Sequence, residues 1–411
     1  MSRDGFARHA ALALPYAYAL LLPLLPLLIE LADVLPRGIA VVGKHTAIVL
    51  AAVTAAAAAG GVVAAIAGWG WRAMLRAPLL WALAGLVASE CIAAAAGIAR
   101  GAGVFEIACE IGDALAFVVF WLTLHDVRAR RVFLGLFFAS GIGACAFAIA
   151  LTLSRHPPAQ FAYEHGRAAG TFLQPNEFAG YLLFLIPLGI AQIASTRWLA
   201  RLGVGASGIG VIALAMSASR AAVLGLVLAA PILVRRFGTR ALVAYLVAAV
   251  IGLGLGFTLA RDIAHDPSEN ASRIAVWEGA ARMAERFALV GVGPLAFSIA
   301  YPLYKMPDAR VDEVHAHDLP LNVLIENGVA GLAAFAFAVI TSIRAARAAS
   351  KRIEPSDRER TLLFAALTVS FAASAVQNAV DLVTTFVLLL WWPMMGLMLG
   401  MARPADEASG A

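Results

Sequence analysis

Residues 203–234 read GVGASGIGVIALAMSASRAAVLGLVLAAPILV, an apolar run whose middle holds Ser217, Ser219 and Arg220. As a single helix this run would be about 48 Å long at about 1.5 Å per residue, whereas the hydrocarbon core of a bilayer is about 30 Å thick. A single crossing would also put one of the two flanking basic clusters on the outer side of the membrane. We therefore predict two short spans that form a tight hairpin, with Arg220 at its apex.

The whole chain shares this apolar character. Of its 411 residues, 62% are hydrophobic and 14% are charged. A soluble protein of this length could not bury so much apolar surface, and the apolar stretches lack the alternation typical of β-strands. We predict an all-α integral membrane protein, a single polytopic domain over residues 1–411 with about twelve transmembrane helices. Their expected positions are 10–31, 45–67, 78–99, 104–125, 132–154, 171–195, 200–218, 220–234, 241–260, 320–343, 361–380 and 382–402.

The distribution of basic residues indicates the orientation of the spans. Most of the 31 Lys and Arg residues fall in segments that lie on the same side of the membrane as the N-terminus. Cytoplasmic segments carry such an excess, so both termini are expected in the cytoplasm. Residues 261–319, between the ninth and tenth spans, then form one long outer loop. In a membrane protein the first question about a net charge of +5 is which side of the membrane holds it, and we expect no nucleic-acid partner.

The long outer loop contains an amphipathic segment. Residues 272–297, SRIAVWEGAARMAERFALVGVGPLAF, predict a helix followed by a Gly-Val-Gly-Pro turn. We expect Trp277 to lie near the membrane interface, a depth that suits its ring. The apolar face of this helix is expected to hold Ile274, Trp277, Ala281 and Met283.

Two histidines, His315 and His317, come shortly before the tenth span. A His-x-His pair could bind a metal ion, but the loop lacks an evident third ligand, so we predict no metal site. A histidine near a helix start is often structural. Beside several arginines at a membrane surface, it could also act as a general base.

Further polar residues lie at the ends of the expected spans. Arg220 could extend its charge to the membrane surface or bind an anion such as a phosphate. In RAAGTFLQPNEFAGY, residues 167–181, Asn176 could cap the sixth span, a role that leaves Arg167 unexplained. Asp381, between the last two spans, could orient a histidine or pair with an arginine.

Four acidic residues fall inside the third and fourth expected spans. Glu106, Glu110 and Asp113 are spaced to share one helix face, and Glu90 lies in the neighbouring span. Acidic residues at this depth face protein or a cavity. They could form a proton or ion path, or could pair with basic residues.

Four motifs, taken in order, resemble the bacterial O-antigen ligase and polymerase superfamily of polytopic membrane glycosyltransferases. They are GTFLQPNEFAGY at 170–181, SASRAAVLGLV at 217–227, SRIAVWEGAARM with GVGPLAF within 272–297, and AHDLPLNVLIENGVAGL at 316–332. Together they cover roughly residues 165–335. The first 150 residues resemble the family only as apolar spans.

The resemblance implies an O-antigen ligase, an enzyme that transfers glycan from a lipid-linked donor. The donor would be O-antigen on undecaprenyl pyrophosphate, and the acceptor a sugar of the lipid A core. It implies a bacterial inner membrane protein with a periplasmic active site, a metal-independent inverting reaction and no cofactor. Membrane lipids would be its other partners.

The resemblance also implies roles for individual residues. The family's catalytic histidine falls on His317, and its two pyrophosphate-binding arginines fall on Arg220 and Arg273. Asp318 stands where the family usually has Asn. His315, Arg167, Asn176, Asp318 and Asp381 are secondary candidates for the site.

Three other functions stay open at this point. An O-antigen polymerase would use a second lipid-linked glycan as acceptor, and polymerases often carry Arg-x10-Gly spacings, which Arg155 to Gly166 and Arg282 to Gly293 fit. A protein O-glycosylating transferase of the same superfamily is a second alternative. A proton-coupled transporter would need the four membrane acids and could dispense with His317.

Overall fold

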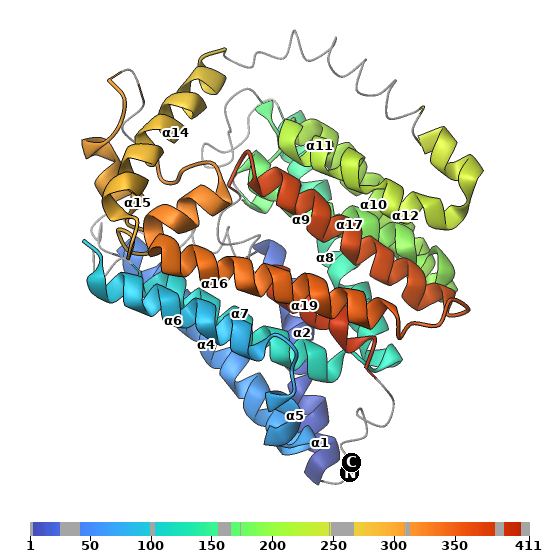
Figure 1. Ribbon diagram of the computed structural model, residues 1–411. Coiled ribbons are helices and arrows are strands. Elements are labelled where there is room, and N and C mark those ends of the chain that lie inside the picture. The colour runs from blue at the N-terminus through green and yellow to red at the C-terminus, as the bar shows by residue number, and fades with distance from the viewer. Residues whose placement is uncertain are drawn as a thin grey trace. The chain divides into compact units, whose positions relative to one another are not determined.

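The computed structural model in Figure 1 consists of helices and connecting turns. It describes residues 3–24, 42–98, 103–154, 166–172, 174–245, 247, 267–307, 309, 313–382 and 390–403. Every regular element in these ranges is helical, so the predicted all-α fold is confirmed. The chain divides into two compact units: unit 1 comprises Met1–Leu136, Val276–Glu354 and Thr384–Ala411, and unit 2 comprises Phe137–Ala275 and Pro355–Val383.

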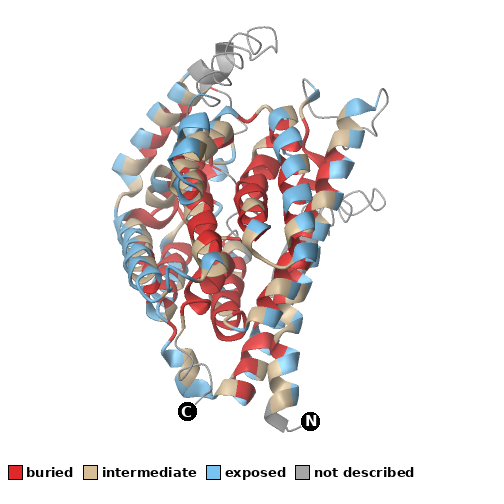
Figure 2. Ribbon diagram, turned by 90° about the vertical axis from the view of Figure 1, so that its right-hand side faces the viewer, coloured by how far each residue is buried: buried red, intermediate tan, exposed pale blue. Residues whose placement is uncertain are grey.

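Five of the described helices are long and apolar enough to cross a membrane. They are α8 (Val127–Leu153), α9 (Pro175–Ala191) with the 3-10 turn Gln192–Ala194, α10 (Arg197–Ser217), α16 (Leu319–Ser350) and α17 (Arg358–Asn378). Large apolar side chains such as Trp81, Val204 and Phe337 are exposed on helices, as expected where lipid is the solvent. Figure 2 shows helices with buried and exposed faces. The number of twelve spans remains a prediction, and most of the expected ninth span, 241–260, lies outside the described residues.

Unit 1 contains the N-terminal helices and the C-terminal one. They are α1 (Arg3–Ala11), α2 (Ala13–Leu21), α4 (Val42–Trp69), α5 (Trp71–Leu75), α6 (Leu80–Ala96), α7 (Val104–Thr123) and α19 (Trp391–Gly400). Helix α7 packs against α4, α6 and α19. A Cβ built on Gly396 would lie 2.5 Å from the carbonyl oxygen of Phe117, so glycine allows α19 to approach α7 this closely.

The segment between α14 (Pro267–Phe287) and α16 has its own apolar core. It also includes α15 (Phe297–Ala300) and the 3-10 turn η7 (Tyr301–Leu303). A helix thus occupies much of the predicted amphipathic segment, but its buried face matches the predicted apolar face only at Met283. Val276, Ala280 and Met283 are fully buried, whereas Ile274 and Ala281 are exposed. The buried face belongs to a cluster with Phe297, Tyr301 and Ile325, contacts that helical periodicity alone cannot reveal.

Helix α16 is broken at Gly328, whose φ of 65° and ψ of −171° are not helical. The backbone N–H groups of Val292 and Gly293 donate to the carbonyls of Ile325 and Glu326, each at 2.9 Å. On the other side of the break, the N–H of Val329 donates to Ala288 O at 2.7 Å. The turn after α14 therefore satisfies backbone groups that the break releases.

In unit 2, α9 packs against both α10 and α17, and α17 packs against α11 (Arg220–Ala229). The short α12 (Pro231–Val234) and the 3-10 turn Arg235–Phe237 follow α11. Helix α10 ends at Ser217, Ala218 takes a left-handed conformation with φ 52°, and α11 begins at Arg220. The predicted break at this position is confirmed, and residues 203–234 do not form a single helix.

Candidate functional site

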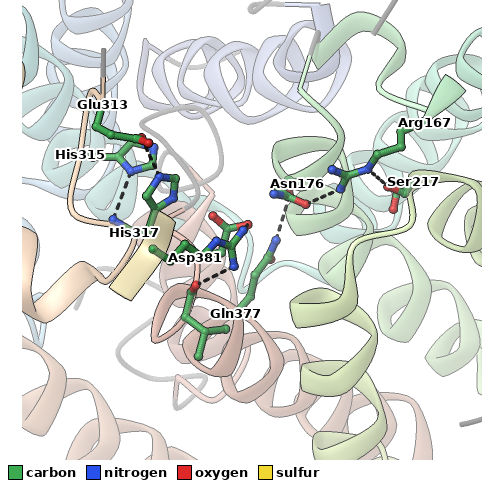
Figure 3. A network of polar contacts seen from close by, with 10 residues as sticks. Arg167, Asn176, Ser217, Glu313, His315, His317, Gln377 and Asp381 are labelled. Carbon is green, nitrogen blue, oxygen red and sulfur yellow. Dashed lines mark hydrogen bonds and ion pairs between the residues drawn. The ribbon is translucent and has the colours of Figure 1, made fainter. Parts of the chain in front are cut away.

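In unit 2, Arg167 holds the end of α10 against the start of α9. Its Nε donates to the carbonyl of Ser217 at 2.9 Å, and its Nη2 donates to Oδ1 of Asn176 at 2.9 Å (Figure 3). The next residue, Ala168, donates its backbone N–H to Met216 O at 2.9 Å. The turn before Arg220 is thereby fixed by side-chain and backbone hydrogen bonds.

Asn176 has a different role from the predicted one. The N-cap of α9 is Gln174, and Asn176 lies inside the first turn of the helix. Its side chain accepts from Arg167, and its backbone carbonyl accepts from Nε2 of Gln377 at 2.9 Å. The prediction that Asn176 caps the helix is wrong, because the guanidinium of Arg167, 9 residues earlier in the chain, donates to its side-chain oxygen.

Arg220 is the first residue of α11 and is exposed. It forms no hydrogen bond or ion pair with the residues that the structure describes. The residue before it, Ser219, is buried, so the turn itself is packed while the guanidinium faces outward. A permanent charge on a packed turn is suited to binding an anion.

Arg273, near the start of α14, contacts the end of α17 within unit 2. Its Nη1 donates to Val380 O at 3.3 Å, and its Nη2 lies 3.7 Å from Oδ2 of Asp381. Asp381 therefore pairs with an arginine, one of the two roles expected for it. The side chain of Arg273 is 29% exposed against 6% for Asp381, so the carboxylate is buried beneath an accessible guanidinium.

In unit 1, His317 lies in the irregular segment before α16. Its Nε2 is 3.0 Å from Oε2 of Glu313, and its ring lies edge-on to that of His315, with 4.5 Å between centroids (Figure 3). The backbone N–H of His317 donates to Nδ1 of His315 at 3.3 Å. His317 has a φ of 53°, which non-glycine residues rarely adopt.

Asp318 caps helix α16. Its Oδ1 accepts from the N–H of Leu321 at 2.7 Å, and Pro320 follows in the first turn of the helix, where proline is favoured. An aspartate at this position therefore supplies the helix cap that an asparagine could also supply.

Two buried polar residues of α16 hold the histidine segment in place. Asn322 accepts from the N–H of Ala316 at 3.0 Å and donates to Oε2 of Glu326 at 3.0 Å. Glu326 also accepts from the N–H of Phe297 at 3.2 Å. Sequence reasoning missed both residues, together with Glu313, although the buried positions of Asn322 and Glu326 in an apolar helix were a usable signal.

Tyr301 lies beneath this segment and is completely buried. Its ring stacks on that of Phe297, with 5.1 Å between centroids. Burial, followed by the nearby charge of Glu313, raises the pKa of the Tyr301 hydroxyl above 10.0. The phenol is therefore neutral at physiological pH.

The membrane acids also lie in unit 1. Asp113 accepts a hydrogen bond from the Tyr18 hydroxyl at 3.3 Å, and Glu90 and Glu106 each keep one buried oxygen without a hydrogen-bond partner among the described residues. Within the described part of the chain, no three His, Cys, Asp or Glu side chains are placed to hold a metal ion.

The structure thus brings the candidates together in three groups. Arg167 and Asn176 hold the turn before Arg220, Arg273 pairs with Asp381, and His315, His317 and Asp318 share one segment. Arg155, part of the polymerase spacing, lies outside the described residues. Gly293, at the end of the other spacing, has a φ of 104° and pairs with Glu326, which gives this glycine a structural role.

Comparison with known proteins agrees with the resemblance seen in the motifs. Residues 205–336 match a family model described as O-antigen ligase. No curated protein matches the chain. The matched segment contains the turn before Arg220, the start of α14 and the histidine segment. This segment, about a third of the chain, is similar to O-antigen ligases, and five of the described helices are long and apolar enough to cross a membrane.

Proposed function

We propose that this protein is an O-antigen ligase of the bacterial inner membrane. It transfers O-antigen from undecaprenyl pyrophosphate to a sugar of the lipid A core on the periplasmic face. The observation that carries the proposal is the match of residues 205–336 to the O-antigen ligase family, because this segment includes Arg220, Arg273 and His317. The proposal keeps twelve spans, cytoplasmic termini and a periplasmic loop at 261–319.

In the proposed reaction, His317 is the general base. The acceptor hydroxyl oxygen attacks the anomeric carbon of the donor, and its proton passes to the imidazole. The bond between the anomeric carbon and the pyrophosphate oxygen breaks, and undecaprenyl pyrophosphate leaves with the electron pair. A positioned base contributes about 10²–10⁴-fold to the rate. Direct attack inverts the anomeric centre.

Arg220 and Arg273 bind the pyrophosphate of the donor. Guanidinium groups are permanently charged and match phosphate oxygens in bidentate geometry. They stabilise the negative charge that develops as the pyrophosphate leaves, a contribution that a divalent metal makes in other glycosyltransferases. The proposed reaction accordingly uses neither a metal nor another cofactor.

The proposal is tested by the lipopolysaccharide of a deletion strain complemented with the wild-type chain, His317→Ala, Arg220→Ala or Arg273→Ala. If the protein is a ligase, each variant should lose long-chain lipopolysaccharide, and polymerised glycan should accumulate on the carrier lipid. Core that carries a single repeat unit would instead indicate a polymerase, and unmodified lipopolysaccharide with an underglycosylated protein would indicate a protein transferase. Wild-type lipopolysaccharide from all three variants would reject the assigned residues.

A further inference from the structure

We propose that Glu313 is a positioning residue for His317, which holds the imidazole in one tautomer and stabilises the ring when it carries a proton. This inference rests on the proposed function, in which His317 is the base. It names a residue that the sequence motifs do not single out.

Glu313 and His317 form a close contact between half-buried side chains. Oε2 of Glu313 lies 3.0 Å from Nε2 of His317, within the range of a charge-assisted hydrogen bond. The side chains are only 16% and 20% exposed, so water screens the interaction poorly. The pair therefore orients the ring more strongly than an exposed ion pair would.

The backbone gives a second, independent argument. A spacing of four residues brings side chains together in a helix, but residues 313–318 are not helical. The contact instead depends on the left-handed φ of 53° at His317 and on the hydrogen bond from Ala316 to Asn322. Non-glycine residues rarely adopt this conformation, and such strain persists where the surrounding structure imposes it.

The other titratable groups that the structure describes between α15 and the start of α16 have partners of their own or stay neutral. Asp318 caps α16, and Nδ1 of His315 accepts the backbone N–H of His317. The ammonium of Lys305 donates to the carbonyls of Met306, Pro307 and Ala309. Tyr301 stays neutral because its pKa is raised. Among the described residues, the carboxylate of Glu313 lies within hydrogen-bond distance of the His317 ring.

The chemical consequence follows from the two ring nitrogens. When Nε2–H donates to the Glu313 carboxylate, the lone pair of the neutral imidazole lies on Nδ1. Nδ1 then takes the proton of the acceptor hydroxyl, and the ring becomes a cation. The carboxylate of Glu313 stays ionised and stabilises that cation until the proton leaves to water.

The test measures glycan transfer against pH with the purified full-length chain in lipid vesicles. Its substrates are a glycan on undecaprenyl pyrophosphate and lipopolysaccharide core. For Glu313→Gln we expect kcat to fall about 10²-fold, within the range that a general base contributes. KM for the donor should change less than twofold. The acidic limb of the rate profile should move to lower pH by about one unit, because loss of the carboxylate disfavours the protonated ring.

Three further variants are compared with Glu313→Gln. Glu285→Gln, an exposed glutamate on α14, should behave as the wild type. In a His317→Ala background, Glu313→Gln should cause no further loss, because Glu313 acts through the histidine. If Glu313→Gln yields little folded protein, Glu313→Asp keeps the charge on a shorter side chain and should lower kcat with the acidic limb in its wild-type place.

The outcomes separate the inference from the proposed function. A wild-type kcat and pH profile in Glu313→Gln, or an unchanged kcat in Glu313→Asp, would overturn the role of Glu313 while His317→Ala remains inactive. An active His317→Ala would overturn the proposed function itself.

Discussion

His317 shows how much of this candidate site depends on contacts around one residue. Its backbone is in the left-handed region, its ring contacts both Glu313 and His315, and its neighbour Asp318 begins a helix. The motif around it identifies the histidine. It does not reveal Glu313, because the contact forms across an irregular segment whose path no periodic pattern predicts.

Arg273 carries the first residue-scale prediction. Arg273→Ala should raise KM for the donor about 10- to 100-fold, the effect expected on losing a hydrogen bond to a charged group. Arg273→Lys should recover only part of this loss, because an ammonium cannot reproduce the bidentate fork. Initial rates over a range of donor concentrations measure the effect.

The control for Arg273 is Arg286→Ala on the same helix, where the side chain is exposed. It should leave KM unchanged. Equal increases in the two variants would mean that the effect is one of overall charge on α14, and the specific role of Arg273 would be rejected.

At the scale of elements, Arg167 fixes the turn between α10 and α11. Arg167→Ala removes the hydrogen bonds to the carbonyl of the buried Ser217 and to the side chain of the half-buried Asn176. We expect it to lower the free energy of unfolding by about 1–3 kcal/mol and to reduce transfer, because Arg220 follows this turn. Denaturant unfolding in detergent and initial rates measure the two effects.

Arg201→Ala is the control for Arg167, since Arg201 lies exposed near the start of α10. It should change neither quantity. Undiminished stability in Arg167→Ala would show that the observed hydrogen bonds do not hold the turn.

The break in α16 gives a second prediction at this scale. A Cβ on Gly328 would lie 2.5 Å from the carbonyl oxygen of Leu289, and the φ of 65° disfavours any side chain. Gly328→Ala should therefore destabilise the protein by at least about 1–3 kcal/mol and weaken the contact between α16 and the turn after α14. Thermal unfolding in detergent checks this expectation.

Gly85→Ala serves as the matched control, because nothing lies within 4 Å of a Cβ at that position in α6. It should be neutral or slightly stabilising, since alanine is preferred to glycine inside a helix. Equal stability of Gly328→Ala and Gly85→Ala would contradict the proposed need for glycine at the break.

The sequence predicts the positions of the helices better than it predicts the contacts between them. Apolar length predicted the helices, and the short polar stretch around Ser217 correctly predicted the break before Arg220. The buried face of α14 shares only Met283 with the predicted apolar face, because its packing partners lie in α15 and α16. The side chain of Asn176 likewise binds Arg167, which lies outside the helix, so a local capping rule failed there.

At the scale of the whole molecule, the proposed membrane topology predicts which residues are accessible from the periplasm. Membrane-impermeant thiol reagents should label Ser298→Cys in intact spheroplasts, and should label Ser350→Cys only after the membrane is opened. Both positions are exposed, and they lie on opposite sides of the membrane in the proposed topology. The experiment uses a background in which Cys91, Cys109 and Cys145 are replaced by alanine.

The reverse labelling pattern would place residues 261–319 in the cytoplasm. Because the proposed donor and acceptor meet on the periplasmic face, that pattern would contradict the ligase function as well as the topology.

The central claim is that the chain itself transfers a glycan with His317 as base. The most direct measurement incubates the purified protein in lipid vesicles with glycan on undecaprenyl pyrophosphate and lipopolysaccharide core, and follows both products. The account predicts glycosylated core and free undecaprenyl pyrophosphate in equal amounts from the wild type, with a rate at least about 10²-fold lower in His317→Ala. Equal rates from the two proteins, or no glycosylated core from the folded wild type, would contradict it.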